Sequence, residues 1–121
     1  MIYIGNDIVE NLRISRLIDL YGDKFLSKIF SLKEINSINK KYAFIRYSGK
    51  FAAKEASAKA LMSSGLIKRI SFKDIQILNK ENGAPFIELN NINSKRIKRF
   101  EISISHTSQY ATAIALLELL N

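Results

Sequence analysis

Residues Tyr42–Ser63, YAFIRYSGKFAAKEASAKALMS, form the longest segment with helical spacing in this 121-residue chain. With about 100° between successive residues of a helix, four apolar side chains form one stripe: Phe44, Phe51, Ala58 and Met62. Such a stripe predicts a helix that packs against a sheet or another helix. The sequence Ser63-Ser64-Gly65 follows and is typical of a helix C-terminus, because glycine readily adopts the left-handed turn.

Shorter elements are expected before this helix. Residues Ile2–Val9 are predicted to form a strand, which Gly5-Asn6 interrupts. The spacing of apolar residues predicts helices over Asn11–Tyr21 and Asp23–Phe30. Ser31 and Glu34 then form a capping-box pattern, in which each side chain satisfies a free backbone donor of the other residue, and this pattern opens a further helix.

The C-terminal half is rich in strand-forming residues. A strand over Ile70–Leu78 is followed by the hairpin signal Asn82-Gly83, and Pro85 is expected near the start of the next strand. After a loop at Asn90–Ser94, two more strands are expected at Phe100–Ser105 and Tyr110–Leu117. The fold class is therefore α+β, with N-terminal helices packed on a mainly antiparallel sheet in a single domain of residues 1–121.

Composition limits the classes of function. The chain has 47% hydrophobic residues and no cysteine, which excludes disulfides and zinc–thiolate sites and fits a reducing compartment. The net charge of +8 indicates anionic partners. The longest apolar run, Ala113–Leu117, is too short to span a membrane, and Met1–Glu10 lacks the pattern of a signal peptide. We expect a cytoplasmic protein without membrane contact, and the small core favours oligomerisation.

Glu55 lies near the middle of the apolar stripe. An unpaired carboxylate on a packed face is costly, so Glu55 needs a cation, a metal or a proton. One interpretation is an ion pair with Lys59, which follows one helical turn later. The other is a metal-binding or acid–base carboxylate in a cleft. Lys50 and Lys54 are expected at the edge of the same stripe.

Asp7 is a second carboxylate on an apolar element, on the same strand face as Tyr3 and Val9. It fits a cap of the helix that follows, since Gly5-Asn6-Asp7 is also a turn signal. It fits a metal site equally well. Two carboxylates from different elements suit Mg²⁺, which fills its other positions with water and phosphate oxygens.

His106 is the only histidine and stands between the last two predicted strands. A lone histidine in a loop is more often structural than catalytic. A serine-hydrolase site is not supported, because the chain has no Gly-x-Ser-x-Gly pattern and because Ser105 and His106 point to opposite faces of a strand.

The first predicted helix has an unusual outer side. Its inner face is formed by four residues: Ile14, Leu17, Ile18 and Tyr21. On the opposite side Leu20 falls between Arg13 and Arg16. A scattered surface leucine is normal. Alternatively, an apolar anchor within a basic rim suits docking of an acidic amphipathic helix.

Five segments together resemble the holo-acyl-carrier-protein synthases, the short class of 4′-phosphopantetheinyl transferases, and the resemblance runs essentially end to end. The segments are Gly5–Glu10 (GNDIVE), Gly49–Ala56 (GKFAAKEA) with Lys59–Leu61 (KAL), Phe72–Ile75 (FKDI), Gly83–Pro85 (GAP) and Ser103–Thr107 (SISHT). The block in Gly49–Ala56 is the most specific of the five.

The resemblance implies transfer of 4′-phosphopantetheine from coenzyme A to a serine of apo-acyl carrier protein, with release of 3′,5′-ADP. It assigns Asp7 and Glu55 as Mg²⁺ ligands and Lys59 to the coenzyme A phosphates and proton transfer. Glu55 and a metal-held water are both open as the proton acceptor, with Lys59 less favoured. The remaining expected coenzyme A contacts are Lys50, Ser64, Gly65, Gly83, Pro85, His106 and Thr107.

The same resemblance implies a homotrimer with active sites between subunits and docking of the carrier protein on the first helix, where Arg13 matches. This chain departs from the family in having Lys50 where arginine is usual, Ala84 where lysine is usual, and a longer Met62–Gly65 turn. A small nucleic-acid-binding module is the alternative function. The lysines, however, are dispersed and are not interleaved with aromatic residues, and such a module gives Glu55 no role.

Overall fold

The computed structural model describes residues 1–121. The elements are β1 (Ile2–Glu10), α1 (Asn11–Tyr21), α2 (Asp23–Ile29), α3 (Leu32–Ser37), α4 (Ala43–Ser63), a short 3₁₀ helix η1 (Phe72–Asp74), β2 (Ile75–Asn79), β3 (Pro85–Leu89), β4 (Ile97–His106) and β5 (Tyr110–Leu119). The predicted α+β class, with helices on antiparallel sheets, is confirmed. No helix is both long enough and apolar enough to cross a membrane.

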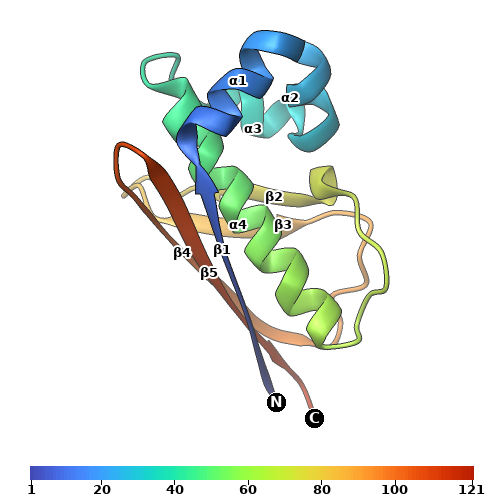
Figure 1. Ribbon diagram of the computed structural model, residues 1–121. Coiled ribbons are helices and arrows are strands. Elements are labelled where there is room, and N and C mark those ends of the chain that lie inside the picture. Colours follow the sequence, from blue (N-terminus) through green and yellow to red (C-terminus); the bar gives the residue numbers. More distant parts are fainter.

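Two antiparallel sheets surround α4. The larger sheet has the order β1-β5-β4, and the smaller one is the hairpin β2-β3. Figure 1 shows α4 lying along one face of the larger sheet, with α1, α2 and α3 gathered around its N-terminal end and both chain termini at the opposite end. The long helix contacts both sheets, through β1, β4, β5 and β2, as well as α1 and η1, and forms the frame of the molecule.

The contact between α4 and β1 is very close. A Cβ atom built on Gly5 would lie 1.9 Å from the carbonyl oxygen of Ala56, so only glycine fits at this position. The helix presents fully buried alanines on this side, among them Ala52, Ala56 and Ala60. The predicted interruption of the first strand at Gly5-Asn6 is wrong, because this glycine permits close packing of a continuous strand.

The predicted apolar stripe on α4 is correct only in its middle. Phe51 and Ala58 are buried, but Phe44 and Met62 at its two ends are 39% and 47% exposed. The central turns of the helix are buried nearly all round.

The local sequence patterns correctly predict most boundaries of the helices and strands. The helices α1 and α2 and the capping box of Ser31 and Glu34 are confirmed. The predicted strand over Ile70–Leu78 is wrong at its start, because η1 precedes β2 with a turn in which Asp74 donates a backbone hydrogen bond to Ser71. Gly83 has a φ of 90° in the hairpin turn and Pro85 opens β3, as predicted.

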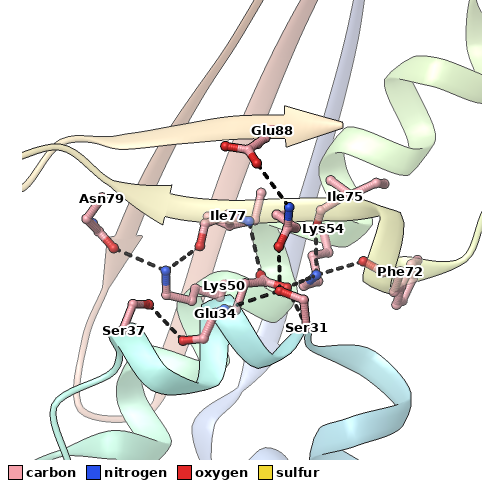
Figure 2. A network of polar contacts seen from close by, with 11 residues as sticks. Ser31, Glu34, Ser37, Lys50, Lys54, Phe72, Ile75, Ile77, Asn79 and Glu88 are labelled. Atoms are coloured by element: carbon pink, nitrogen blue, oxygen red, sulfur yellow. Dashed lines mark hydrogen bonds and ion pairs between the residues drawn. The ribbon is translucent and has the colours of Figure 1, made fainter. Parts of the chain in front are cut away.

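A buried polar network joins α3, α4 and β2 (Figure 2). Lys54 donates hydrogen bonds to Glu34 and to the carbonyl oxygens of Phe72 and Ile75, at 2.7, 2.7 and 2.5 Å. The Glu34 carboxylate also accepts from the backbone of Ser31 and Ile77, both at 3.0 Å. These side chains satisfy the outer edge of β2, which has no neighbouring strand on that side. Helical spacing places Lys54 at the edge of the stripe, and the structure shows that its side chain is fully buried there.

Candidate active site

A pocket of about 510 Å³ lies where the N-terminal half of α4 meets the β2-β3 hairpin and the end of β4. Four residues expected to contact coenzyme A line it: Lys50, Gly83, Pro85 and His106. The structure thus brings together residues that lie more than fifty positions apart in the sequence.

Lys50 is the buried cation of this pocket. It is only 5% exposed, although helical spacing places it at the edge of the apolar stripe. Its Nζ atom donates hydrogen bonds to the carbonyl oxygen of Ile77 and, at 3.1 Å, to Oδ1 of Asn79 (Figure 2). An ammonium group has three donors, so one N–H stays available for a ligand. Burial lowers the pKa of Lys50 to about 8, and the positive charges of Lys54 and Arg46 act in the same direction.

Sequence reasoning missed three polar residues of this pocket. Tyr42, Arg46 and Asn79 also line it. The signal for Arg46 was present, because it stands one helical turn before Lys50 and therefore on the same side of α4. Asn79 carried no local signal, since its place depends on the pairing of β2 with β3.

A second group of charged residues consists of Glu55 and Lys59 on α4 and Asp7 on the neighbouring strand β1. The Nζ atom of Lys59 lies 3.1 Å from Oδ1 of Asp7 and 3.1 Å from the backbone oxygen of Asn6. The predicted ion pair of Lys59 with Glu55 is therefore replaced by a pair with Asp7. The alternative that Asp7 caps the first helix is also wrong, because Glu10 occupies that position and makes no side-chain cap.

The environment of Glu55 disfavours its charged form. Its side chain is half-buried, and burial raises the pKa of Glu55, with the negative charge of Asp7 adding to the effect. The positive charges of Lys59 and Arg13 act in the opposite direction. Two carboxylates close enough to repel each other favour a shared cation.

The donor set fits Mg²⁺. No cluster of three or more histidine, cysteine, aspartate or glutamate side chains is present, so a metal at this position would have two carboxylate ligands at most. This is the number of protein carboxylates that Mg²⁺ usually takes when substrate phosphates and water complete its shell.

The two groups lie on different sides of α4. Five residues separate Lys50 from Glu55, which corresponds to about 140° around the helix axis. Lys50 faces the β2-β3 hairpin, and Glu55 interacts with Asp7 on β1. A ligand that contacts both groups must therefore extend around the helix or bridge two copies of the chain.

Three further residues that were expected to contact coenzyme A have local structural roles. Ser64 donates to the backbone oxygen of Leu61 at 2.6 Å, and Gly65 adopts a φ of 77° at the end of α4, as expected for a helix C-terminus. Thr107 accepts hydrogen bonds from the backbone of Gln109 and Tyr110 in the β4-β5 turn. None of the three lines the pocket around Lys50.

The first helix exposes the residues expected to dock a carrier protein. Arg13 and Arg16 are exposed, and Leu20 is 73% exposed. The assignment of Tyr21 to the inner face is wrong, because its side chain is 56% exposed. With Lys24 it lines a groove of about 380 Å³ between α1 and α2.

Comparisons with known proteins agree with this architecture. The sequence model of the 4′-phosphopantetheinyl transferase superfamily, ACPS, matches residues 3–115. The holo-[acyl-carrier-protein] synthase of Protochlamydia amoebophila is 41% identical over 116 residues, covering 93% of this chain and 94% of the relative. That of Ehrlichia chaffeensis is 44% identical over 119 residues, covering 94% of each protein.

Solved structures give the same result. The Helicobacter pylori holo-[acyl-carrier-protein] synthase in complex with coenzyme A matches with a TM-score of 0.82 and 36% identity, covering 95% of this chain and 99% of that one. The Neisseria meningitidis enzyme matches with a TM-score of 0.83 and 32% identity, covering 98% and 99%. Similarity in sequence and in fold thus extends over nearly the whole chain, and the chain belongs to the holo-[acyl-carrier-protein] synthase family of 4′-phosphopantetheinyl transferase enzymes.

Proposed function

We propose that this enzyme transfers 4′-phosphopantetheine from coenzyme A to a serine of apo-acyl carrier protein, in a Mg²⁺-dependent reaction that releases 3′,5′-ADP. The observation that carries the proposal is the group formed by Asp7, Glu55 and Lys59 in a chain of this family. Two carboxylates and a lysine beside α4 are a suitable set to hold and align a pyrophosphate.

The reaction is an attack of the serine hydroxyl on the β-phosphate of the coenzyme A pyrophosphate. A Mg²⁺ ion held by Asp7 and Glu55 would neutralise charge on the phosphate oxygens. Either the Glu55 carboxylate or a water held by the metal would accept the proton of the hydroxyl. Lys59, whose half-exposed side chain lies beside Asp7, would contact the same phosphates.

The pocket around Lys50 is proposed to bind the nucleotide half of coenzyme A. It combines Lys50, Arg46 and His106 at one opening, a composition that favours a phosphorylated ligand. Gly83 and Pro85 form its hairpin wall. Ser64, Gly65 and Thr107 would contact coenzyme A from a neighbouring subunit.

A homotrimer with active sites between subunits forms part of the proposal. The outer face of the larger sheet carries uncovered apolar side chains, with Ile4, Ile8 and Ile114 exposed by 59%, 62% and 49%. Exposed apolar surface of this extent supports an interface with another copy. Asp7 and Lys59 line a hollow of about 500 Å³ together with Ile114, so the proposed metal ligand borders this face.

The experiment is an incubation with apo-acyl carrier protein, coenzyme A and Mg²⁺, followed by mass spectrometry of the carrier protein. The expected result is the mass gain of one phosphopantetheine group, which disappears when EDTA replaces Mg²⁺. A matched variant, Asp7→Asn, keeps the shape of the ligand and removes its charge. Unmodified carrier protein with the wild-type enzyme, or full modification in EDTA, would contradict the proposal.

A further inference from the structure

Asn79, at the last position of β2, connects two parts of the pocket wall. Its Oδ1 atom accepts a hydrogen bond from Nζ of Lys50 at 3.1 Å (Figure 2). Its Nδ2 atom donates to the backbone oxygen of Gly83 at 2.9 Å. The amide therefore links the cation on α4 to the hairpin turn, and both of these lie on the pocket wall.

The two buried lysines of α4 differ in the donors that they leave free. Lys54 uses all three of its donors, on Glu34 and on two backbone oxygens of the chain. Lys50 uses two, on Ile77 and Asn79. The contact with Ile77 holds the ammonium to the strand, and the contact with Asn79 fixes its orientation, so that the third donor has a defined direction.

We propose that Asn79 is a positioning residue of the pocket. Its side chain orients the Lys50 ammonium toward an anionic ligand and holds the Gly83 turn beside that ammonium. The proposal rests on the proposed function, in that the anion is taken to be a phosphate of coenzyme A. A side chain that fixes a cation before binding lowers the entropy lost when the ligand arrives.

The position of Asn79 makes the proposal testable without loss of the fold. Its side chain is exposed, so replacing it creates no cavity in the core. The same hairpin supplies a matched control in Asn82, whose Oδ1 atom accepts a hydrogen bond from the backbone of Ala84 at 3.0 Å. Asn82 stabilises the turn in a similar way, but it neither contacts Lys50 nor lines the pocket.

The experiment measures binding of coenzyme A and of 3′,5′-ADP by calorimetry, and transfer kinetics, for the wild type, Asn79→Ala and Asn82→Ala. Loss of one hydrogen bond to a charged group predicts that Asn79→Ala weakens binding about tenfold. Its Michaelis constant for carrier protein should be unchanged. The control Asn82→Ala should bind within about twofold of the wild type, since surface changes away from the site have small effects.

A double-mutant cycle with Lys50→Met then tests whether Asn79 acts through Lys50. In the Lys50→Met background, Asn79→Ala should weaken binding less than about twofold, because the oriented cation is already absent. An equal effect of Asn79→Ala in both backgrounds, or an equal loss in Asn82→Ala, would refute the positioning role. Absence of binding by the wild type would instead contradict the proposed function, so the two failures are distinguishable.

Discussion

The ion pair between Glu34 and Lys54 is the buried interaction whose removal has the clearest consequence. Both side chains are fully buried, and the two charged atoms lie 2.7 Å apart. Removing one partner of a buried ion pair destabilises a protein by about 3–5 kcal/mol, because the other charge is left uncompensated. We therefore expect Glu34→Gln to lower the free energy of unfolding by about this amount, a large part of the stability of a small domain.

The double variant Glu34→Leu/Lys54→Met separates the cost of an unpaired buried charge from the cost of backbone groups that lose their hydrogen-bond partners. In many proteins, replacing both members of a buried ion pair by apolar residues is neutral or stabilising. Here the two side chains also satisfy four backbone groups, the N–H groups of Ser31 and Ile77 and the carbonyl groups of Phe72 and Ile75. Each buried backbone group left without a partner costs about 1–3 kcal/mol. Two of these hydrogen bonds, those of Ile75 and Ile77, are buried, so the double variant should remain at least about 2 kcal/mol less stable than the wild type.

Urea unfolding at fixed protein concentration measures both variants, since assembly would make stability depend on concentration. The surface pair of Lys33 with Glu88, at 3.2 Å and largely exposed, is the control, and Lys33→Ala should change stability by less than about 1 kcal/mol. Recovery of wild-type stability in Glu34→Leu/Lys54→Met would contradict this prediction, because it would mean that the outer edge of β2 does not need these side chains.

The remaining predictions concern activity and assembly. Glu55→Gln should lower the transfer rate by at least about a hundredfold, as expected for loss of a general base, while circular dichroism stays that of the wild type. Because Lys50 loses its proton with a pKa of about 8, the affinity for coenzyme A should fall as pH rises through this value. Calorimetry should show no such fall in Lys50→Arg, since guanidinium stays charged. Ile114→Glu, which places a charge on the uncovered sheet face, should give monomers in light scattering, and unchanged assembly would exclude this face. Arg13→Glu should raise the Michaelis constant for carrier protein roughly tenfold, or about 1.4 kcal/mol, and leave that for coenzyme A unchanged; equal effects on both would remove α1 from docking.

Local patterns were sufficient wherever a residue's partners are its neighbours in sequence. The bounds of α1, the capping box at Ser31 and the Asn82-Gly83 turn all follow from short-range rules. The failures come from long-range contacts. Lys59 pairs with Asp7, 52 positions away, although Glu55 stands one helical turn before it. The i,i+4 rule describes an isolated helix, and here the strand beside α4 offers a partner that the rule does not consider.

The burial of Lys54 is a second case in which a local sequence pattern does not reveal a long-range partner. Helical spacing placed it at the edge of the stripe, where a lysine is normally solvated. Its partner, Glu34, is recognised in the sequence as part of a capping box. That local role is a sufficient reason for a glutamate at this position, so nothing points to a second role. A residue that satisfies one local rule gives no sign that it also has a distant role. This is why the network that fixes β2 was not predicted.

The use of α4 as a common frame connects the two halves of the site. The close contact of Gly5 with Ala56 fixes β1, and with it Asp7, relative to Glu55. On the other side of the helix, Lys50 and Lys54 fix β2, and with it the pocket wall, through backbone oxygens. About 140° of helix rotation separates the two halves. A second copy of the chain that presents its pocket to the carboxylates of the first would bring the two halves of the proposed site together.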